Sequence, residues 1–413
     1  MRRATVVKRV AWGAAVVTLL GGLVGCSSGD GTGGKKALES AWLVGPDQPK
    51  TMKGKAAWVS GNAVVRVRSD GAAAYDLATG RTLWTHTVPA PQIVCTVAEH
   101  ADQGVGLIGQ GLEDEPCDRV TAIDLASGKA LWTRRLARNA IPGTNYYGVI
   151  EAGAGSALIP VAGRVRALDL RTAKARWTWA PPRGCAFTAK DSAMAAGPDT
   201  VVATFRCGKR AAKIAVADPA RGRTRWVADL GAGAKFDAAD VLSVSPLVVR
   251  VKEGGERSRD ELLTFDAKGT RLGTIPVSGP EGDFELAMGG FARKIAVGAD
   301  RIHVVSEAPT SRLSERDLLT FDLTGKRLWR SAFEYGVESL ALADGRLAVL
   351  SEDPGDPAPL VTLDPATGKR VRTSLLRYDL SSTAATRMII VGGRHVMLSE
   401  GASTGSRPTI MAF

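Results

Sequence analysis

Residues 71–88 read GAAAYDLATGRTLWTHTV, and this stretch decides the fold that the sequence predicts. Small and apolar residues alternate with others on both sides of segment 76–80, which is the pattern of two strands joined by a tight turn. Asp76 can accept hydrogen bonds from amides of its own turn, and Gly80 can adopt a positive φ without a Cβ clash. Trp84 gives the second strand a large apolar surface. The stretch is therefore expected to form a β-hairpin.

The same turn recurs down the chain, and in four copies a tryptophan follows the aspartate by eight residues. These copies contain Asp76, Gly80 and Trp84; Asp124, Gly128 and Trp132; Asp169 and Trp177, with Ala173 in place of the glycine; and Asp218, Gly222 and Trp226. Three looser copies contain Asp266, Gly269 and Gly273; Asp322, Gly325 and Trp329; and Asp364, Gly368 and Arg372. The aspartates lie 48, 45, 49, 48, 56 and 42 residues apart, a period that suits one four-stranded propeller blade. Seven complete blades are predicted.

An eighth blade is expected to be split between the two ends of the chain. The final residues 408–413, PTIMAF, resemble residues 260–265, DELLTF, which lie just before a motif aspartate. The stretch Lys35 to Trp42, KKALESAW, resembles the strand that normally follows the turn. Pairing these strands would close the ring and remove exposed sheet edges. The sequence thus predicts an all-β, eight-bladed propeller of four-stranded antiparallel blades, closed by its N- and C-terminal strands.

The first 26 residues have the features of a lipoprotein signal peptide. Basic residues precede a short apolar core, and residues 23–26, LVGC, form a bacterial lipobox. Cleavage would leave Cys26 carrying acyl chains such as palmitate, which gives a stable membrane anchor. Residues 27–36 follow as a flexible tether, and residues 37–413 as the propeller domain. The chain is expected to be exported and anchored to the outer face of the cytoplasmic membrane, or to an outer membrane if the cell has one.

The repeated pattern AxDxxTGxxxW resembles the quinoprotein-type (PQQ-like) propeller repeat, in which the tryptophan docks against the neighbouring blade. The resemblance covers residues 35–413, nearly the whole exported chain. Within that superfamily, an eight-bladed propeller on a bacterial lipoprotein is most similar to the outer-membrane assembly factor B type. This resemblance implies a binding or assembly scaffold for another envelope protein that carries no cofactor and is not an enzyme.

The alternative that the same superfamily implies is a PQQ-dependent alcohol or sugar dehydrogenase. Such enzymes typically use an adjacent cysteine pair, a calcium site and a catalytic carboxylate, whereas this sequence has no Cys-Cys dipeptide. Its histidines, His86, His100, His303 and His395, are too scattered for a zinc site. The repeated aspartates are assigned to turns. We therefore predict no catalytic, cofactor-binding or metal-binding residues.

The distribution of basic residues argues against nucleic acid as a partner. The formal net charge is +12, and the four basic residues of the signal peptide account for part of it. No basic run is interleaved with aromatic residues, as grooves for single-stranded nucleic acid require. We expect the basic residues to be dispersed over exposed strands, with attraction to anionic lipid headgroups as the other interpretation. The expected partners are the membrane and an envelope protein, with no nucleic acid, and the domain is expected to be monomeric by itself.

Four cysteines remain besides Cys26, and an even number in an exported protein favours disulfides. Three connectivities are possible for four cysteines. Cys95 and Cys185 fall early in a first strand, and Cys117 and Cys207 fall at or just past the end of the strand that follows. Antiparallel pairing brings these positions together, and both pairs are separated by 22 residues. The local pairs Cys95–Cys117 and Cys185–Cys207 are therefore preferred.

A partner is expected on the face that carries the connections between the second and third strands. Four of these connections are polar, charged or rich in Pro and Gly: residues 253–261, 307–317, 352–359 and 400–407. Aromatic residues lie in or beside the crossings between blades: Tyr146, Tyr147, Phe187, Phe236, Phe284, Tyr335 and Tyr378. They would form an aromatic rim for a partner. Alternatively, each ring packs between its own blade and the next.

Overall fold

The computed structural model describes residues 37–47, 53–136, 141, 149–188, 192–208, 211–232, 235–254, 259–286, 294–307, 315–351, 357–377, 386–400 and 408–413. These residues belong to one compact unit, Ala37–Phe413. The regular elements among the described residues are all strands. Within the described ranges, no helix has the length and apolar character needed to cross a bilayer.

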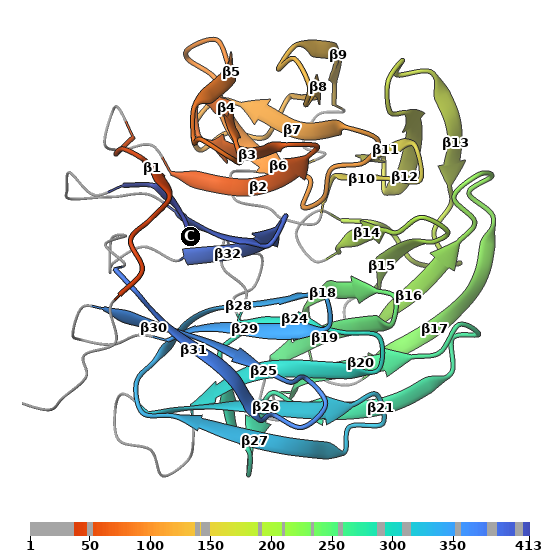
Figure 1. The fold of residues 1–413 in the computed structure, drawn as a ribbon. Helices are drawn as coiled ribbons and strands as arrows, with labels where there is room; N and C mark the ends of the chain where they lie inside the picture. Colours follow the sequence, from red (N-terminus) through yellow and green to blue (C-terminus); the bar gives the residue numbers. More distant parts are fainter. Residues whose placement is uncertain are drawn as a thin grey trace, which may run out of the picture. The chain divides into compact units, whose positions relative to one another are not determined.

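Eight antiparallel sheets follow one another in a ring, which Figure 1 shows in sequence colours from orange through yellow and green to blue. Each blade begins with an inner strand, called a here, and ends with an outer strand, called d. The first four blades are β2 (Gly54–Ser60), β3 (Ala63–Arg68), β4 (Gly71–Asp76) and β5 (Thr82–Thr87); β6 (Ile93–Val97), β7 (Val105–Gly111), β8 (Arg119–Asp124) and β9 (Ala130–Arg135); β10 (Glu151–Gly153), β11 (Ser156–Val161), β12 (Arg164–Asp169) and β13 (Ala175–Trp179); β14 (Met194–Ala196), β15 (Val201–Cys207), β16 (Ala211–Ala217) and β17 (Thr224–Ala232).

The remaining blades complete the all-β, eight-bladed propeller that the sequence predicts. They are β18 (Lys235–Val244), β19 (Leu247–Gly254), β20 (Arg259–Phe265) and β21 (Arg271–Pro276); β24 (Ile295–Val297), β25 (Arg301–Glu307), β26 (Arg316–Asp322) and β27 (Arg327–Phe333); β28 (Val337–Ala343), β29 (Arg346–Ser351), β30 (Ala358–Leu363) and β31 (Arg370–Leu376); β32 (Thr386–Val391), β33 (Arg394–Ser399) and β34 (Ile410–Ala412) with β1 (Trp42–Val44).

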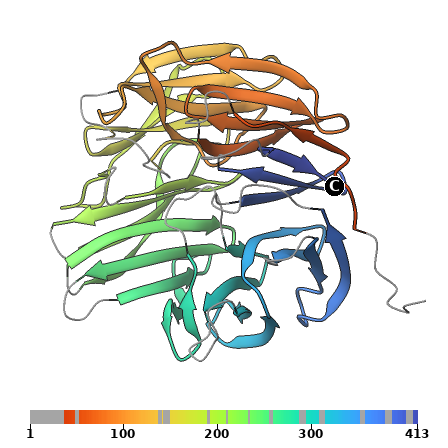
Figure 2. The same ribbon diagram turned by 90° about the vertical axis from the view of Figure 1, so that its left-hand side faces the viewer.

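The hydrophobic core lies between blades rather than within one. All residues of β7 are buried, because neighbouring blades cover both faces of such a strand. One core cluster joins Trp58 and Val65 of blade 1 to Val94, Ile108 and Ile123 of blade 2. The outer strands, in contrast, are mostly exposed, and inner strands of neighbouring blades contact one another, as β28 contacts β32. Figure 2 shows the blades from the side.

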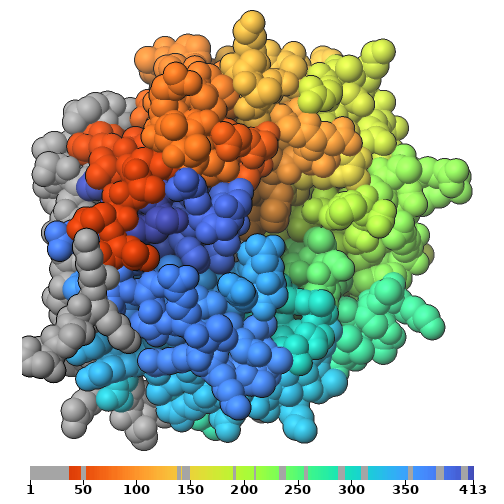
Figure 3. Space-filling model, viewed as in Figure 1, coloured from red at the N-terminus to blue at the C-terminus, as the bar shows by residue number. Residues whose placement is uncertain are grey.

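The ring is closed by strands from both ends of the described chain, as predicted. β1 pairs with β34 in antiparallel register, with Trp42 opposite Ala412. The sequence placed this strand within Lys35–Trp42, whereas β1 begins only at Trp42, the last residue of that stretch. Leu38 instead forms a parallel bridge to Leu376 in the outer strand of blade 7. The N-terminal segment therefore joins blades 7 and 8, and Figure 3 shows it in red against the blue blades.

Blade 6 contains an insertion that explains the longest spacing between motif aspartates, 56 residues. The crossing from blade 5 forms a short hairpin, β22 (Ser278–Gly279) and β23 (Gly282–Phe284). β23 pairs with the end of β25, and β24 pairs with its beginning. The inner edge of this blade is thus made by two short strands. The repeat pattern did not indicate this hairpin.

Candidate functional site

The motif aspartates are occupied by their own turns. Each carboxylate accepts hydrogen bonds from backbone amides two to four residues further on; these aspartates are Asp76, Asp124, Asp169, Asp218, Asp266, Asp322 and Asp364. The hydroxyl of Thr79, followed by the amides of Thr79 and Ala78, holds the pKa of Asp76 below its ordinary value. A carboxylate bound in this way is an acceptor within a turn and is unsuited to accept a proton in catalysis.

The motif tryptophans join consecutive blades by one repeated contact, which we call the tryptophan dock. The indole Nε1 donates to the carbonyl oxygen of the residue after the aspartate in the next blade; the pairs are Trp42 with Leu77, Trp84 with Leu125, Trp132 with Leu170, Trp177 with Pro219, Trp226 with Ala267 and Trp329 with Pro365. The indole also covers the turn glycine. A Cβ on Gly222, for example, would lie 2.6 Å from Trp177 Cδ2.

The turn glycine therefore has two reasons to lack a side chain. Gly222 has a φ of +63°, a conformation that favours glycine, and an indole lies directly against it. Sequence reasoning identified only the first reason. In blade 3, Ala173 adopts the same conformation, with a φ of +57°.

Two junctions between blades lack the tryptophan dock. Between blades 5 and 6, where Gly273 replaces tryptophan, the Thr264 hydroxyl donates to the Leu323 carbonyl at 2.5 Å. A Cβ on Gly273 would collide with the backbone of Thr324, so the two blades approach more closely there. Between blades 7 and 8, Arg372 stands at the tryptophan position, and no comparable contact replaces the dock in the described residues.

Both disulfides are the local pairs that the sequence favours. Cys95 is bonded to Cys117, and Cys185 to Cys207. In blade 2, the bond joins strand β6 to the connection after β7, and both cysteines lie in the core between blades 2 and 3. The two bonds leave none of these four cysteines as a free thiol.

His303 is buried in blade 6 and predicts a dependence of stability on pH. Burial, and then the charge of Arg301, lowers the pKa of His303 from 6.5 to about 4. The unfolded chain therefore takes up a proton as the pH falls below 6.5, while the folded chain does not. We expect the free energy of unfolding to decrease by about 3 kcal/mol between pH 7 and pH 4 from this group. Chemical denaturation at several pH values measures the effect.

The matched variants are His303→Gln and Leu83→Gln. The first should reduce the slope of the stability profile between pH 7 and pH 4, since it removes one group whose pKa differs between the folded and unfolded chain. The second changes an exposed side chain that carries no titratable group and should leave the slope unchanged. Equal slopes in the His303→Gln variant and the unmodified chain would contradict this assignment.

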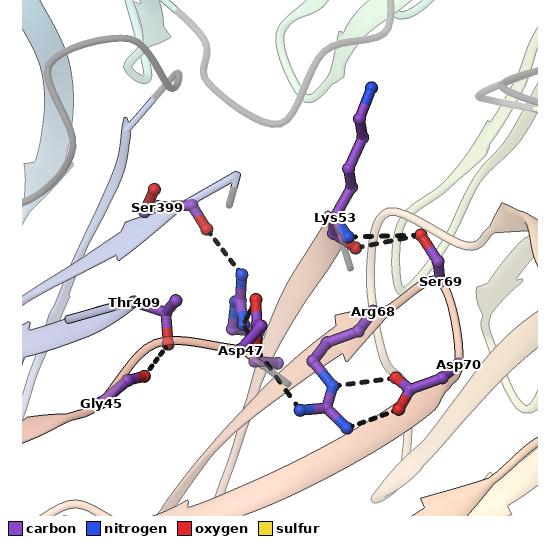
Figure 4. A network of polar contacts seen from close by, with 9 residues as sticks. Gly45, Asp47, Lys53, Arg68, Ser69, Asp70, Ser399 and Thr409 are labelled. Atoms are coloured by element: carbon purple, nitrogen blue, oxygen red, sulfur yellow. Dashed lines mark hydrogen bonds and ion pairs between the residues drawn. The ribbon is translucent and has the colours of Figure 1, made fainter. Parts of the chain in front are cut away.

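The face that carries the b–c connections and the crossings between blades, called the loop face here, is held at blade 1 by a buried ion pair. Asp47 accepts hydrogen bonds from Arg66 Nη1 at 2.6 and 2.7 Å, and the Arg66 side chain is 0% exposed. Arg66 Nη2 also donates to the Ser399 carbonyl of blade 8 at 3.0 Å. Arg68 contacts Asp47 at 3.4 Å and pairs with Asp70, as Figure 4 shows. We call this network the clasp.

A second group of ion pairs fixes the loop face at blades 5 and 6. Arg250 donates to both carboxylate oxygens of Asp260, at 2.8 and 2.6 Å, and to the Leu286 carbonyl. Glu285 pairs with Lys294 and Arg316, and these hydrogen bonds, opposed by burial, hold the pKa of Glu285 below its ordinary value. These contacts anchor the crossing that follows the inserted hairpin.

Two exposed carboxylates lie opposite one another on this face. Asp283 of β23 is the register partner of Glu307 at the end of β25. No ion pair to either carboxylate is found among the described residues. Like charges directly opposite one another in a sheet are destabilising. We call this pair the acidic edge, and it stands out in a chain whose net charge is +12.

The predicted aromatic rim is only partly described. Phe187 is 3% and Phe284 is 6% exposed, and both rings fill blade cores, as the alternative for these positions held. Tyr335 is partly buried beside the crossing into blade 7. Tyr146, Tyr147 and Tyr378 and the side chain of Phe236 lie outside the described residues, as do much of the four long connections and Cys26.

Among the described residues, no group of three or more His, Cys, Asp or Glu side chains is arranged to hold a metal ion. The cysteines pair across neighbouring segments 22 residues apart rather than as adjacent residues. The motif carboxylates are bound in turns. We therefore derive no catalytic step from these residues.

Comparison with known proteins was made at the level of sequence and of fold. The family model described as "Outer membrane protein assembly factor BamB" matches residues 68–320. No curated protein sequence matches the chain significantly. BamB from Moraxella catarrhalis is similar in structure, with 16% identity, a TM-score of 0.52, and coverage of 86% of this chain and 96% of that one.

Other solved propellers are similar to the same extent. The computationally designed Ika8 protein has 14% identity and a TM-score of 0.56, covering 92% of this chain and 99% of its own. Quinohemoprotein alcohol dehydrogenase ADHIIG from Pseudomonas putida HK5 has 12% identity and a TM-score of 0.54, covering 90% of this chain and 75% of its own. These structural likenesses establish a shared fold and extend no further.

Proposed function

Because this chain belongs to the family of the outer membrane protein assembly factor BamB, we propose that it is a non-catalytic, lipid-anchored protein of the cell envelope that binds another envelope protein. The loop face of the propeller would provide the binding surface. Its connections vary in length from blade to blade, whereas the opposite face repeats the same Asp turn. Variable loops on a rigid scaffold are where binding residues commonly lie.

The acidic edge is the observation that carries this proposal. Asp283 and Glu307 are exposed like charges in register with one another, and Arg316 lies opposite Glu307 on its other side. A partner that presents basic side chains would relieve the repulsion between these like charges on binding. The ion pairs of Arg250 and Glu285 hold the hairpin crossing in place and thereby preorganise the edge.

Reversal of these charges tests the proposed surface. Asp283→Lys combined with Glu307→Lys should reduce the capture of envelope proteins by the tagged, membrane-anchored chain by at least about tenfold, because charge complementarity is inverted. Both side chains are exposed, so the fold should persist; because the lysine introduced by Glu307→Lys would face Arg316, the melting temperature of the variant is measured alongside capture. Quantitative mass spectrometry of captured proteins provides the measurement.

The control for this experiment lies on the opposite face. Asp199→Lys combined with Asp300→Lys reverses two exposed charges in the turns between strands a and b. This variant should capture the same proteins as the unmodified chain. If both double variants lose capture equally, or neither does, the acidic edge is not the binding surface.

The lipid anchor is the second part of the proposal and concerns Cys26, outside the described residues. It is supported by the lipobox LVGC at residues 23–26 and by the two disulfides, which are typical of exported proteins. Cells grown with a labelled fatty acid should incorporate label into the chain, and Cys26→Ala should abolish it. Label retained in the Cys26→Ala variant would mean that no acyl chain is attached at this position.

A further inference from the structure

A cavity of about 630 Å³ lies at the junction of blades 7 and 8. Blade 7 contributes Arg346, Leu360 and Arg372 to its lining, and blade 8 contributes His395 and Phe413. Leu38 of the N-terminal segment also borders it, so the cavity is at the place where the ring closes. Its volume is within the range of pockets that bind small ligands or peptide side chains.

The cavity lies at the junction where neither part of the tryptophan dock is present: blade 7 has no tryptophan, and blade 8 has no Asp turn to receive one. Arg372 lies eight residues after Asp364 and is paired with Thr362, the same register that Trp84 has with Ala74 in blade 1. No Asp turn joins the third and fourth strands of blade 8, because β34 and β1 are far apart in the sequence. At six other junctions an indole covers this position.

The chemistry of the lining specifies the ligand further. Among the described residues, neither Arg346 nor Arg372 forms an ion pair, although Asp344 also borders the cavity. Burial, and then the charge of Arg372, lowers the pKa of His395, so His395 is neutral at pH 7. The guanidinium groups of Arg346 and Arg372 therefore lie beside apolar walls without an ion-pair partner among the described residues, where they can meet carboxylates of a ligand.

We propose that this cavity, called the seam pocket here, binds a tryptophan side chain of a partner protein that is flanked by acidic residues. The indole would occupy the position that the docked tryptophan has at other junctions, and the flanking carboxylates would meet Arg346 and Arg372. The lining of the seam pocket runs along β31 from the turn at Asp344 to Leu376, and it includes no residue of blade 6, where the acidic edge lies. The inference goes beyond the proposed function and does not depend on the acidic edge.

Binding of a defined peptide tests the proposal. The probe is the fluorescein-labelled heptapeptide Ser-Gly-Glu-Trp-Glu-Gly-Ser, titrated with the full chain in non-ionic detergent and followed by fluorescence anisotropy. We expect saturable binding that weakens at least about tenfold when alanine replaces the tryptophan of the peptide, since buried tryptophans carry much of the energy of an interface. Absence of binding, or equal binding of the alanine peptide, would overturn the proposal.

Variants of the pocket separate its apolar and charged contributions. Arg372→Trp supplies the indole that the motif has elsewhere and should block the peptide, while Arg372→Gln and Arg346→Gln should each weaken it about three- to tenfold. Arg134→Gln removes an exposed arginine from the outer strand of blade 2 and should bind like the unmodified chain. If Arg134→Gln weakens binding as much as Arg372→Gln, the attraction is general charge and the seam pocket is not the site.

The acidic-edge variant makes the two proposals independently testable. Asp283→Lys combined with Glu307→Lys should bind the heptapeptide with unchanged affinity, because these residues belong to blade 6, which does not line the seam pocket. Loss of protein capture together with intact peptide binding would support both proposals. Intact capture with no peptide binding would remove the seam pocket and leave the proposed function standing.

Discussion

Asp47→Ala should lower the free energy of unfolding by about 3 to 5 kcal/mol, which is the expected cost of leaving a buried charge without its partner. The Arg66 side chain is 0% exposed and the Asp47 side chain 5% exposed, so water cannot replace the carboxylate. Arg66 Nε already has no hydrogen-bond partner in the described chain, and the guanidinium would keep the Ser399 carbonyl as its main acceptor. Equilibrium denaturation in urea gives the measurement.

A second substitution distinguishes the loss of the pair from damage to packing. Adding Arg66→Met to Asp47→Ala removes the unpaired charge and should recover much of the lost stability, because a buried pair can often be replaced by apolar side chains at little cost. Asp118→Ala is the matched control, since Arg119 and Asp118 form an exposed pair worth less than about 1 kcal/mol. An Asp47→Ala variant no less stable than Asp118→Ala would show that the clasp contributes little.

The sequence predicted the propeller correctly because its repeat is chemical as well as numerical. Aspartate and glycine recur because each turn needs them locally, and tryptophan recurs because each outer strand docks on the turn of the next blade. The ring closure followed from the same repeat, but the stretch Lys35–Trp42 was assigned to one strand. Only Trp42 belongs to that strand, and Leu38 bridges to blade 7, because the segment is long enough to cross the seam.

Contacts between residues that are far apart in the sequence, or outside the repeat, could not be predicted from the sequence pattern. Asp47 and Arg66 are 19 residues apart and belong to no repeat, so the clasp could not be inferred from spacing. The inserted hairpin at 278–284 and the seam pocket arise from departures from the repeat. Gly273 and Arg372 were recognised as missing tryptophans. Whether the place of a missing indole is closed or left as a cavity depends, however, on how closely the two blades approach. That distance is a property of the tertiary structure.

The junction between blades 8 and 1 should be the weakest point of the ring if its dock is removed. Trp42 is 8% exposed, and its Nε1 donates to the Leu77 carbonyl at 3.0 Å. Trp42→Ala should therefore lower the free energy of unfolding by about 3 to 5 kcal/mol, the usual cost of truncating a buried tryptophan. Trp84→Ala removes an equivalent dock between blades 1 and 2 and is the control for that cost.

The two variants should differ in local opening, because β1 is only three residues long. It is held to blade 8 by its pairing with β34, by packing of the Trp42 ring and by the hydrogen bond from the Thr409 hydroxyl to the Gly45 carbonyl, and Trp42→Ala removes the packing. The amide of Thr409 donates to the Val44 carbonyl at 2.9 Å, so its hydrogen exchange reports whether β1 remains in place. Exchange at Thr409 should accelerate much more in Trp42→Ala than in Trp84→Ala, since local opening needs only the free energy that holds one short strand. If Thr409 stays equally protected in both, the strand pairing closes the ring without help from the dock, and the clasp at Asp47 would then be the contact that retains β1.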